Sequence, residues 1–73
     1  MSDALKQLKD VITIMLDDCD PYTYPHVCNM AGNQETRPEL EEMIINMAKK
    51  TGDSVGAIIH QIERAYNPNM MED

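Results

Sequence analysis

The fold is decided by residues 37–66, RPELEEMIINMAKKTGDSVGAIIHQIERAY, which carry two helical patterns on either side of one glycine. In each half, apolar residues recur three or four positions apart, as on the core-facing side of a helix. These positions are Leu40, Met43, Ile44, Met47 and Ala48, followed by Val55, Ile58, Ile59, Ile62, Ala65 and Tyr66. Gly52 suits the left-handed conformation that ends many helices. The sequence therefore predicts helices over 37–50 and 54–66, joined by a very short turn and packed on each other.

Both helices are preceded by residues that favour a helix start. The segment TRPE, residues 36–39, fits a capping box. In that motif the Thr36 hydroxyl accepts the backbone N–H of Glu39, and the Glu39 carboxylate reaches back. Asp53 or Ser54 is suited to cap the second helix, because short polar side chains accept first-turn N–H groups.

The N-terminal segment predicts a third amphipathic helix, over residues 3–17. Its expected core face carries Leu5, Leu8, Ile12 and Met15, with Val11 and Leu16 beside them. No segment shows the alternation typical of a strand. We therefore predict an all-α fold, a single domain over residues 1–73. It has three helices, a structured connector over 19–36 and a flexible tail over 67–73.

The connector contains an unusual stretch, CDPYTYPHVCNM, residues 19–30. Pro21 and Pro25 fix their own φ angles and bias the residues before them towards extended geometry. In an extended stretch Tyr22 and Tyr24 face the same side. Rigid paired aromatics favour a protein-binding anchor, and the alternative is that they cover the exposed end of a core poor in aromatic residues. The candidate partner-binding residues are Tyr22, Tyr24, His26 and Met30.

The same stretch raises the question of a metal. Cys19, His26 and Cys28 form the pattern C-x6-H-x-C, and a nearby aspartate is a possible fourth ligand. This spacing is not one of those common in zinc sites, so we expect no metal and no cofactor, with zinc on these three residues as the alternative. Two cysteines without a secretion signal predict reduced thiols and a cytoplasmic location.

The charge limits the classes of partner. The 73 residues include 13 acidic and 6 basic side chains, giving a net charge of −7. Nucleic-acid affinity rests mainly on Lys and Arg, so the composition disfavours nucleic acid and anionic membranes and is compatible with a basic protein. Candidate acidic contacts are Asp17, Asp18 and Asp20. No apolar run is long enough to span a bilayer.

One segment resembles a known family. Residues 47–68, MAKKTGDSVGAIIHQIERAYNP, look like the helix-turn-helix of lambda-repressor-like DNA-binding domains, with Ala48, Gly52 and Ile58 at the family's spacing. The resemblance implies a DNA-binding regulator. Its base-reading residues would be Ser54, Val55, Gly56, Ala57, His60 and Gln61, which include no Arg or Lys.

The sequence shows no catalytic motif. It lacks an evident nucleophile with a base, a phosphate-binding glycine loop and the H-E-x-x-H pattern. A chain this short, without Trp or Phe, also has a thin core, which favours association with another subunit. We therefore expect a non-enzymatic acidic helical protein that acts through protein–protein interaction or self-association. The alternatives are the helix-turn-helix regulator and an acidic inhibitor whose carboxylates stand in for the phosphates of a nucleic acid.

Overall fold

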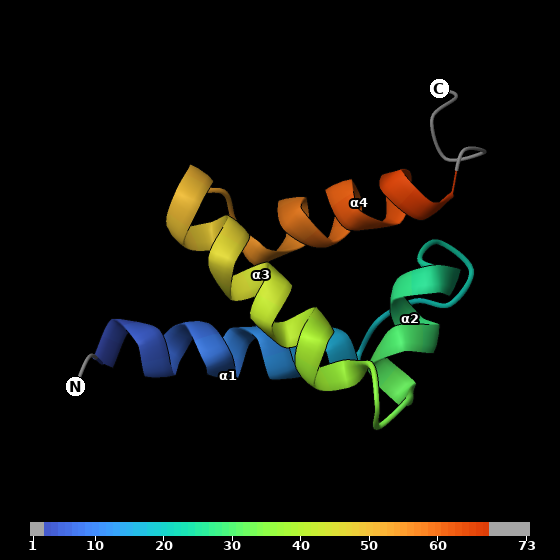
Figure 1. Ribbon diagram of the computed structural model, residues 1–73, viewed down its shortest axis with the longest axis horizontal. Coiled ribbons are helices and arrows are strands. Elements are labelled where there is room, and N and C mark those ends of the chain that lie inside the picture. Colours follow the sequence, from blue (N-terminus) through green and yellow to red (C-terminus); the bar gives the residue numbers. More distant parts are fainter. Residues whose placement is uncertain (1–2, 68–73) are drawn as a thin grey trace.

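The computed structural model describes residues 3–67, and over this range the chain forms helices and no strand. The helices are α1 (Asp3–Asp17), α2 (Pro25–Gly32), α3 (Arg37–Thr51) and α4 (Val55–Tyr66). The all-α class is confirmed, and α1, α3 and α4 begin and end within one residue of their predicted bounds. Figure 1 shows α3 running obliquely between α1 and α4, with α2 at the end where α1 stops.

The helix α2 was missed by the sequence analysis. Three helices were predicted, with residues 19–36 as a connector, but within the described part of the chain there are four. Pro25 occupies the first turn of α2, where its missing N–H does little harm. The preceding residue, Tyr24, makes no side-chain cap. The helix buries Val27 and Ala31, so packing rather than a local start signal holds it in place.

All four helices contribute to one core, and each of them touches the other three. The buried apolar residues are Ile12, Leu16, Val27, Ala31, Leu40, Ile44, Val55, Ile58, Ile59 and Ile62. On α1 the buried positions are Ile12 and Leu16, whereas Met15, which the sequence placed on the core face, is 37% exposed. Leu16 follows Ile12 by four residues, which is also a helical spacing, and the wide apolar arc of α1 allowed either choice.

The turn between α3 and α4 forms as predicted. Gly52 adopts a left-handed conformation, with φ of 79°, and its N–H donates to the Ala48 carbonyl at 2.9 Å. The Ser54 hydroxyl accepts the Ala57 N–H at 3.2 Å and so caps α4. Of the predicted tail, residues 68–73 lie outside the described residues.

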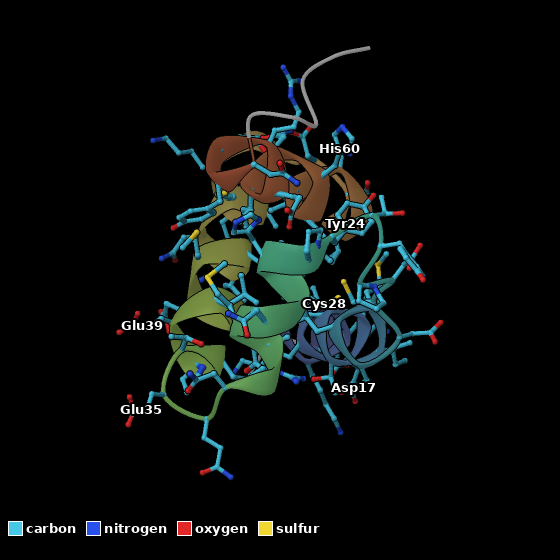
Figure 2. All side chains as sticks on the ribbon, turned by 90° about the vertical axis from the view of Figure 1, so that its right-hand side faces the viewer. Asp17, Tyr24, Cys28, Glu35, Glu39 and His60 are labelled. Atoms are coloured by element: carbon cyan, nitrogen blue, oxygen red, sulfur yellow. The ribbon has the colours of Figure 1, made fainter. Side chains whose placement is uncertain are left out.

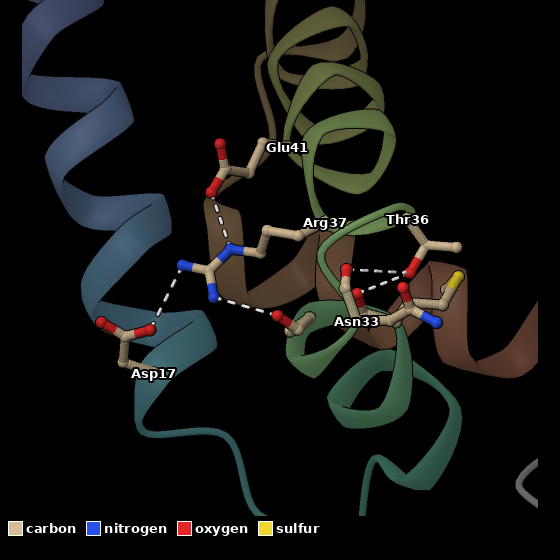
Figure 3. A network of polar contacts seen from close by, with 7 residues as sticks. Asp17, Asn33, Thr36, Arg37 and Glu41 are labelled. Atoms are coloured by element: carbon tan, nitrogen blue, oxygen red, sulfur yellow. Dashed lines mark hydrogen bonds and ion pairs between the residues drawn. The ribbon is translucent and has the colours of Figure 1, made fainter.

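The predicted capping box at the start of α3 is wrong. Thr36 has helical backbone angles, φ −97° and ψ −19°, and makes no side-chain cap. Its hydroxyl instead donates to the Met30 carbonyl at 2.7 Å (Figure 3). The hydroxyl therefore acts as a donor that closes the turn between α2 and α3, and it satisfies a carbonyl at the end of α2.

Arg37 joins three helices at this corner (Figure 3). Its Nε donates to Glu41 at 2.7 Å, one terminal nitrogen to the Ala31 carbonyl at 3.1 Å, and the other to Asp17 at 3.2 Å. Because these acceptors lie on α3, α2 and α1, the planar guanidinium fixes the end of α1 relative to the α2–α3 turn. The hydrogen bond with Glu41 is the main cause that raises the pKa of Arg37.

Candidate partner-binding site

Helix α1 carries a second apolar stripe that the other described helices leave uncovered. Val11 is 43% exposed, Ile14 65% and Met15 37%. Ile14 and Met15 follow Val11 by three and four positions, so both lie next to Val11 on the same side of the helix. We call them the outer stripe of α1. Single exposed apolar residues are common on protein surfaces, but a contiguous group is typical of an interaction site.

The outer stripe leads into a groove between α1 and α4. This α1–α4 groove has a volume of about 190 Å³ and is lined by Met15, Asp18, Cys19, Asp20, Tyr24, Gly56 and Ile59. Gly56 lines the groove, and a Cβ added there would lie 3.4 Å from Cε of Met15. The absent side chain therefore lets Met15 pack closely against α4 at this position. A wider hollow of about 480 Å³ is lined by residues of α3 alone, so no second helix forms an opposite wall.

The three predicted acidic contacts have different surroundings. Asp17 is paired with Arg37 at 3.2 Å. The Asp20 carboxylate accepts the backbone N–H of Tyr22 at 3.0 Å and the hydroxyl of Thr23 at 2.8 Å, so it orders the turn after α1. Asp18 is exposed on the rim of the α1–α4 groove. Asp18 and Asp20 thus give one end of an apolar groove a negative rim.

The tyrosines do not lie in the extended stretch that was predicted. The Tyr24 N–H donates to the Asp20 carbonyl at 2.8 Å, which makes a turn. Tyr22 is 96% exposed, whereas Tyr24 is half-buried and lines the α1–α4 groove. The Tyr24 ring meets His60 edge-on, with centroids 6.3 Å apart (Figure 2). Of the other two predicted contacts, Met30 packs against the core, and the half-exposed His26 ring lies against Glu63.

Glu63 is a fully buried carboxylate that the sequence analysis did not single out. It accepts the backbone N–H of Val27 at 2.9 Å and that of His26 at 3.3 Å. It also lies 2.9 Å from Nδ1 of His26 and accepts the Asn67 amide at 3.2 Å. An ionised carboxylate only accepts hydrogen bonds, so Nδ1 carries the proton. Helical spacing could have indicated that Glu63 is buried, because it follows the buried Ile59 by four residues.

The surroundings of Glu63 favour its charged form. Burial is the largest influence and raises its pKa, but the hydrogen bonds from Val27, His26 and Asn67 together outweigh burial, so the pKa lies below the usual value. The ring of His26 also stacks on Tyr66, with centroids 6.4 Å apart. Glu63 thus fixes the first turn of α2 against α4 and positions the polypeptide that leads into it.

The three residues considered as zinc ligands are not brought together. Cys19 and Cys28 line one cavity, while the His26 ring is bound to Glu63. Across residues 3–67, no three His, Cys, Asp or Glu side chains are grouped so that they could hold a metal ion.

Most of the residues implied by the helix-turn-helix resemblance have contacts within the chain. The Ser54 hydroxyl caps α4, and the Gln61 amide donates to Asp53 at 3.2 Å. His60 contacts Tyr24, and Ala57 is exposed. Ser54 and Gln61 therefore stabilise the start of α4 and the turn before it, and His60 packs beside Tyr24 of the α1–α4 groove.

Comparison of the chain with protein-family models, curated proteins and solved structures finds no match. Among the described residues, no helix has the length and apolar character needed to cross a membrane.

Proposed function

We propose that this chain is a protein-interaction module that binds an amphipathic helix of another protein. The binding surface is the outer stripe of α1 together with the α1–α4 groove. The observation that carries the proposal is the exposed stripe of Val11, Ile14 and Met15, which continues through Met15 into the α1–α4 groove.

The dimensions of the surface suit a short helical segment. From Val11 to Asp18 the helix advances about 10 Å, or two turns, at about 1.5 Å per residue. A partner helix with apolar residues at positions i, i+3 or i+4, and i+7 presents a matching stripe. Met15 lies where the stripe meets the groove, and its flexible side chain can adapt to different apolar contacts.

The charge around the surface favours a basic partner. Asp18 and Asp20 form the negative rim at one end of the groove, so Lys or Arg on the partner would meet opposite charge there. A second copy of this chain fits less well, because each copy has a net charge of −7. The lysines of α1, Lys6 and Lys9, also fall on the side of the helix away from the outer stripe, by the helical repeat.

The proposal is tested with a displayed library of helical peptides randomised on one face, selected on the full chain. The expected enrichment is an apolar stripe with Lys or Arg at one end. The binding of an enriched peptide is then titrated against wild type, Ile14→Asp and Thr13→Asp. Both substitutions add the same charge at an exposed position of α1, so only the apolar contact separates them. We expect Ile14→Asp to weaken binding at least about tenfold, as at a central contact, and Thr13→Asp to leave it unchanged.

Several results contradict the proposal. One is no enrichment above that on an unrelated acidic protein, and another is equal binding by the Ile14→Asp and Thr13→Asp variants. A dimer seen by native mass spectrometry and abolished by Ile14→Asp would instead make a second copy the occupant of this surface.

A further inference from the structure

Two cysteines lie at one junction of the fold. Cys19 follows the end of α1, and Cys28 lies on α2. Both are free thiols and half-buried. They share the wall of a cavity of about 280 Å³, which is also lined by Leu16, Asp17, Pro21, Ala31, Gly32 and Arg37. The turn between the helices therefore brings together two side chains that are nine positions apart in the sequence.

The two cysteines line the same cavity and influence each other. Burial raises the pKa of Cys19 to about 12, and the next cause is a hydrogen bond between its side chain and that of Cys28. Cys19 therefore stays protonated at neutral pH, and its sulfur is a poor first nucleophile because the thiolate is the reactive form. This disfavours Cys19 as the first attacking group, so attack by Cys28 is the favoured first step.

We propose that Cys19 and Cys28 form a reversible disulfide site that joins the end of α1 to α2. The oxidant is a low-molecular-weight disulfide. The Cys28 thiolate attacks one sulfur of that disulfide and displaces the first small thiol, which takes up the proton lost by Cys28. The Cys19 sulfur then attacks the Cys28 sulfur and releases its own proton to the second small thiol as that thiol leaves. Two protein thiols are oxidised, and one small disulfide is reduced to two thiols.

The bridge would act on both stability and binding. It closes the loop over residues 19–28 and restricts the unfolded chain, which stabilises the folded one. Cys19 also lines the α1–α4 groove, so a bond that draws its sulfur towards Cys28 alters that wall. This second consequence rests on the proposed function, but formation of the bridge does not.

The test uses the full chain and hydroxyethyl disulfide. This oxidant is uncharged, so the nearby aspartates do not repel it, and it reacts with thiols while leaving the seven methionines intact. We expect a monomer without free thiols that carries no adduct. Cleavage before Asp20 or after Tyr22 separates the two cysteines unless a bridge joins them, so mass spectrometry should find the two peptides linked. The Tm should rise by about 5–15 °C and return after reduction.

Two variants act as matched controls. Under the same treatment, Cys19→Ser should stop at a mixed disulfide on Cys28, and Cys28→Ser should react more slowly because only the protonated Cys19 remains. The proposal is overturned if wild type ends with adducts on both cysteines, with dimers linked between chains, or with both thiols still free. Loss of peptide binding by Ile14→Asp is a separate readout, so failure of the proposed function and failure of the disulfide are distinguishable.

Discussion

The carboxylate of Glu63 on α4 accepts the backbone N–H of Val27 on α2 at 2.9 Å. Helix α2 has eight residues, which is too short to be stable in isolation. The residue before it supplies no side-chain cap, so its first N–H groups depend on Glu63, 36 positions later in the chain. A buried negative charge at a helix start also complements the helix dipole. Formation of α2 is therefore coupled to the packing of α4.

We predict that Glu63→Gln destabilises the fold by about 1.5–3 kcal/mol, the range for hydrogen bonds to a charged group. The amide keeps the shape of the side chain but replaces one acceptor with a donor facing N–H groups. Urea unfolding followed by circular dichroism measures the difference. Glu42→Gln, at an exposed position of α3, is the control and should change stability by less than about 0.5 kcal/mol. Equal stability of the two variants would contradict this role of Glu63.

The stabilisation from Glu63 should depend on pH. Its pKa in the folded chain is lowered from the usual value of 4.5. A lowered pKa means that the contribution is fully present above the unfolded-state pKa and is lost as pH falls through the folded-state value. The stability difference between wild type and Glu63→Gln should therefore be constant above about pH 5.5 and shrink below pH 4.5. Unfolding curves for both proteins across this pH range test the prediction. A stability difference that grows as the pH falls would contradict it.

Arg37→Lys should cost about 1–2 kcal/mol, because an ammonium group cannot reach three acceptors in the plane of the guanidinium. Most of the loss should come from the bond to the Ala31 carbonyl. The Asp17 partner is 63% exposed, and solvent screens that ion pair. Thermal unfolding without added salt measures the total loss of stability. Unfolding in high salt measures the part that does not depend on the ion pair. Arg64→Lys on the exposed side of α4 is the matched control. A loss that disappears in high salt would assign the effect to the ion pair instead.

Gly56→Ala should separate stability from binding. Gly56 lies in the first turn of α4, so replacing it should stabilise the helix by up to about 0.5 kcal/mol, less than in a helix interior. The new methyl group would be in van der Waals contact with Met15. The same methyl group fills part of the α1–α4 groove, so peptide affinity should fall several-fold. Gly32→Ala adds a methyl group at a position with nothing within 4 Å and should leave affinity unchanged. Calorimetric titration and thermal unfolding give the two readouts, and unchanged affinity in Gly56→Ala would place the peptide outside the groove.

Much of the fold could be predicted because its signals are local. Helices α3 and α4 have continuous apolar stripes, and Gly52 and Ser54 mark the turn between them. Helix α2 could not be predicted in this way, because its N-terminal acceptor, Glu63, lies on another helix. The Thr36 hydroxyl was misassigned for a similar reason, since its acceptor, the Met30 carbonyl, belongs to a helix that was not expected.

The candidate partner-binding site was harder to predict from the sequence. Helical spacing showed that α1 is apolar over a wide arc, but it could not show how much of that arc the other helices cover. The structure buries Leu16 and leaves Met15 and Ile14 exposed, which makes the outer stripe. The α1–α4 groove also depends on the close approach of Gly56 to Met15. These two residues are far apart in the sequence, so helical spacing could not predict that they meet. The exposed Tyr22, by contrast, lies away from the groove lining.

Binding at the outer stripe of α1 is tested most directly by mapping amide chemical shifts of the isotope-labelled chain while it is titrated with an enriched basic helical peptide. We expect the largest changes on Val11, Ile14 and Met15 and on Gly56 across the groove. Changes confined to α3 or to the turn around Tyr22, with the outer stripe of α1 unaffected, would contradict it.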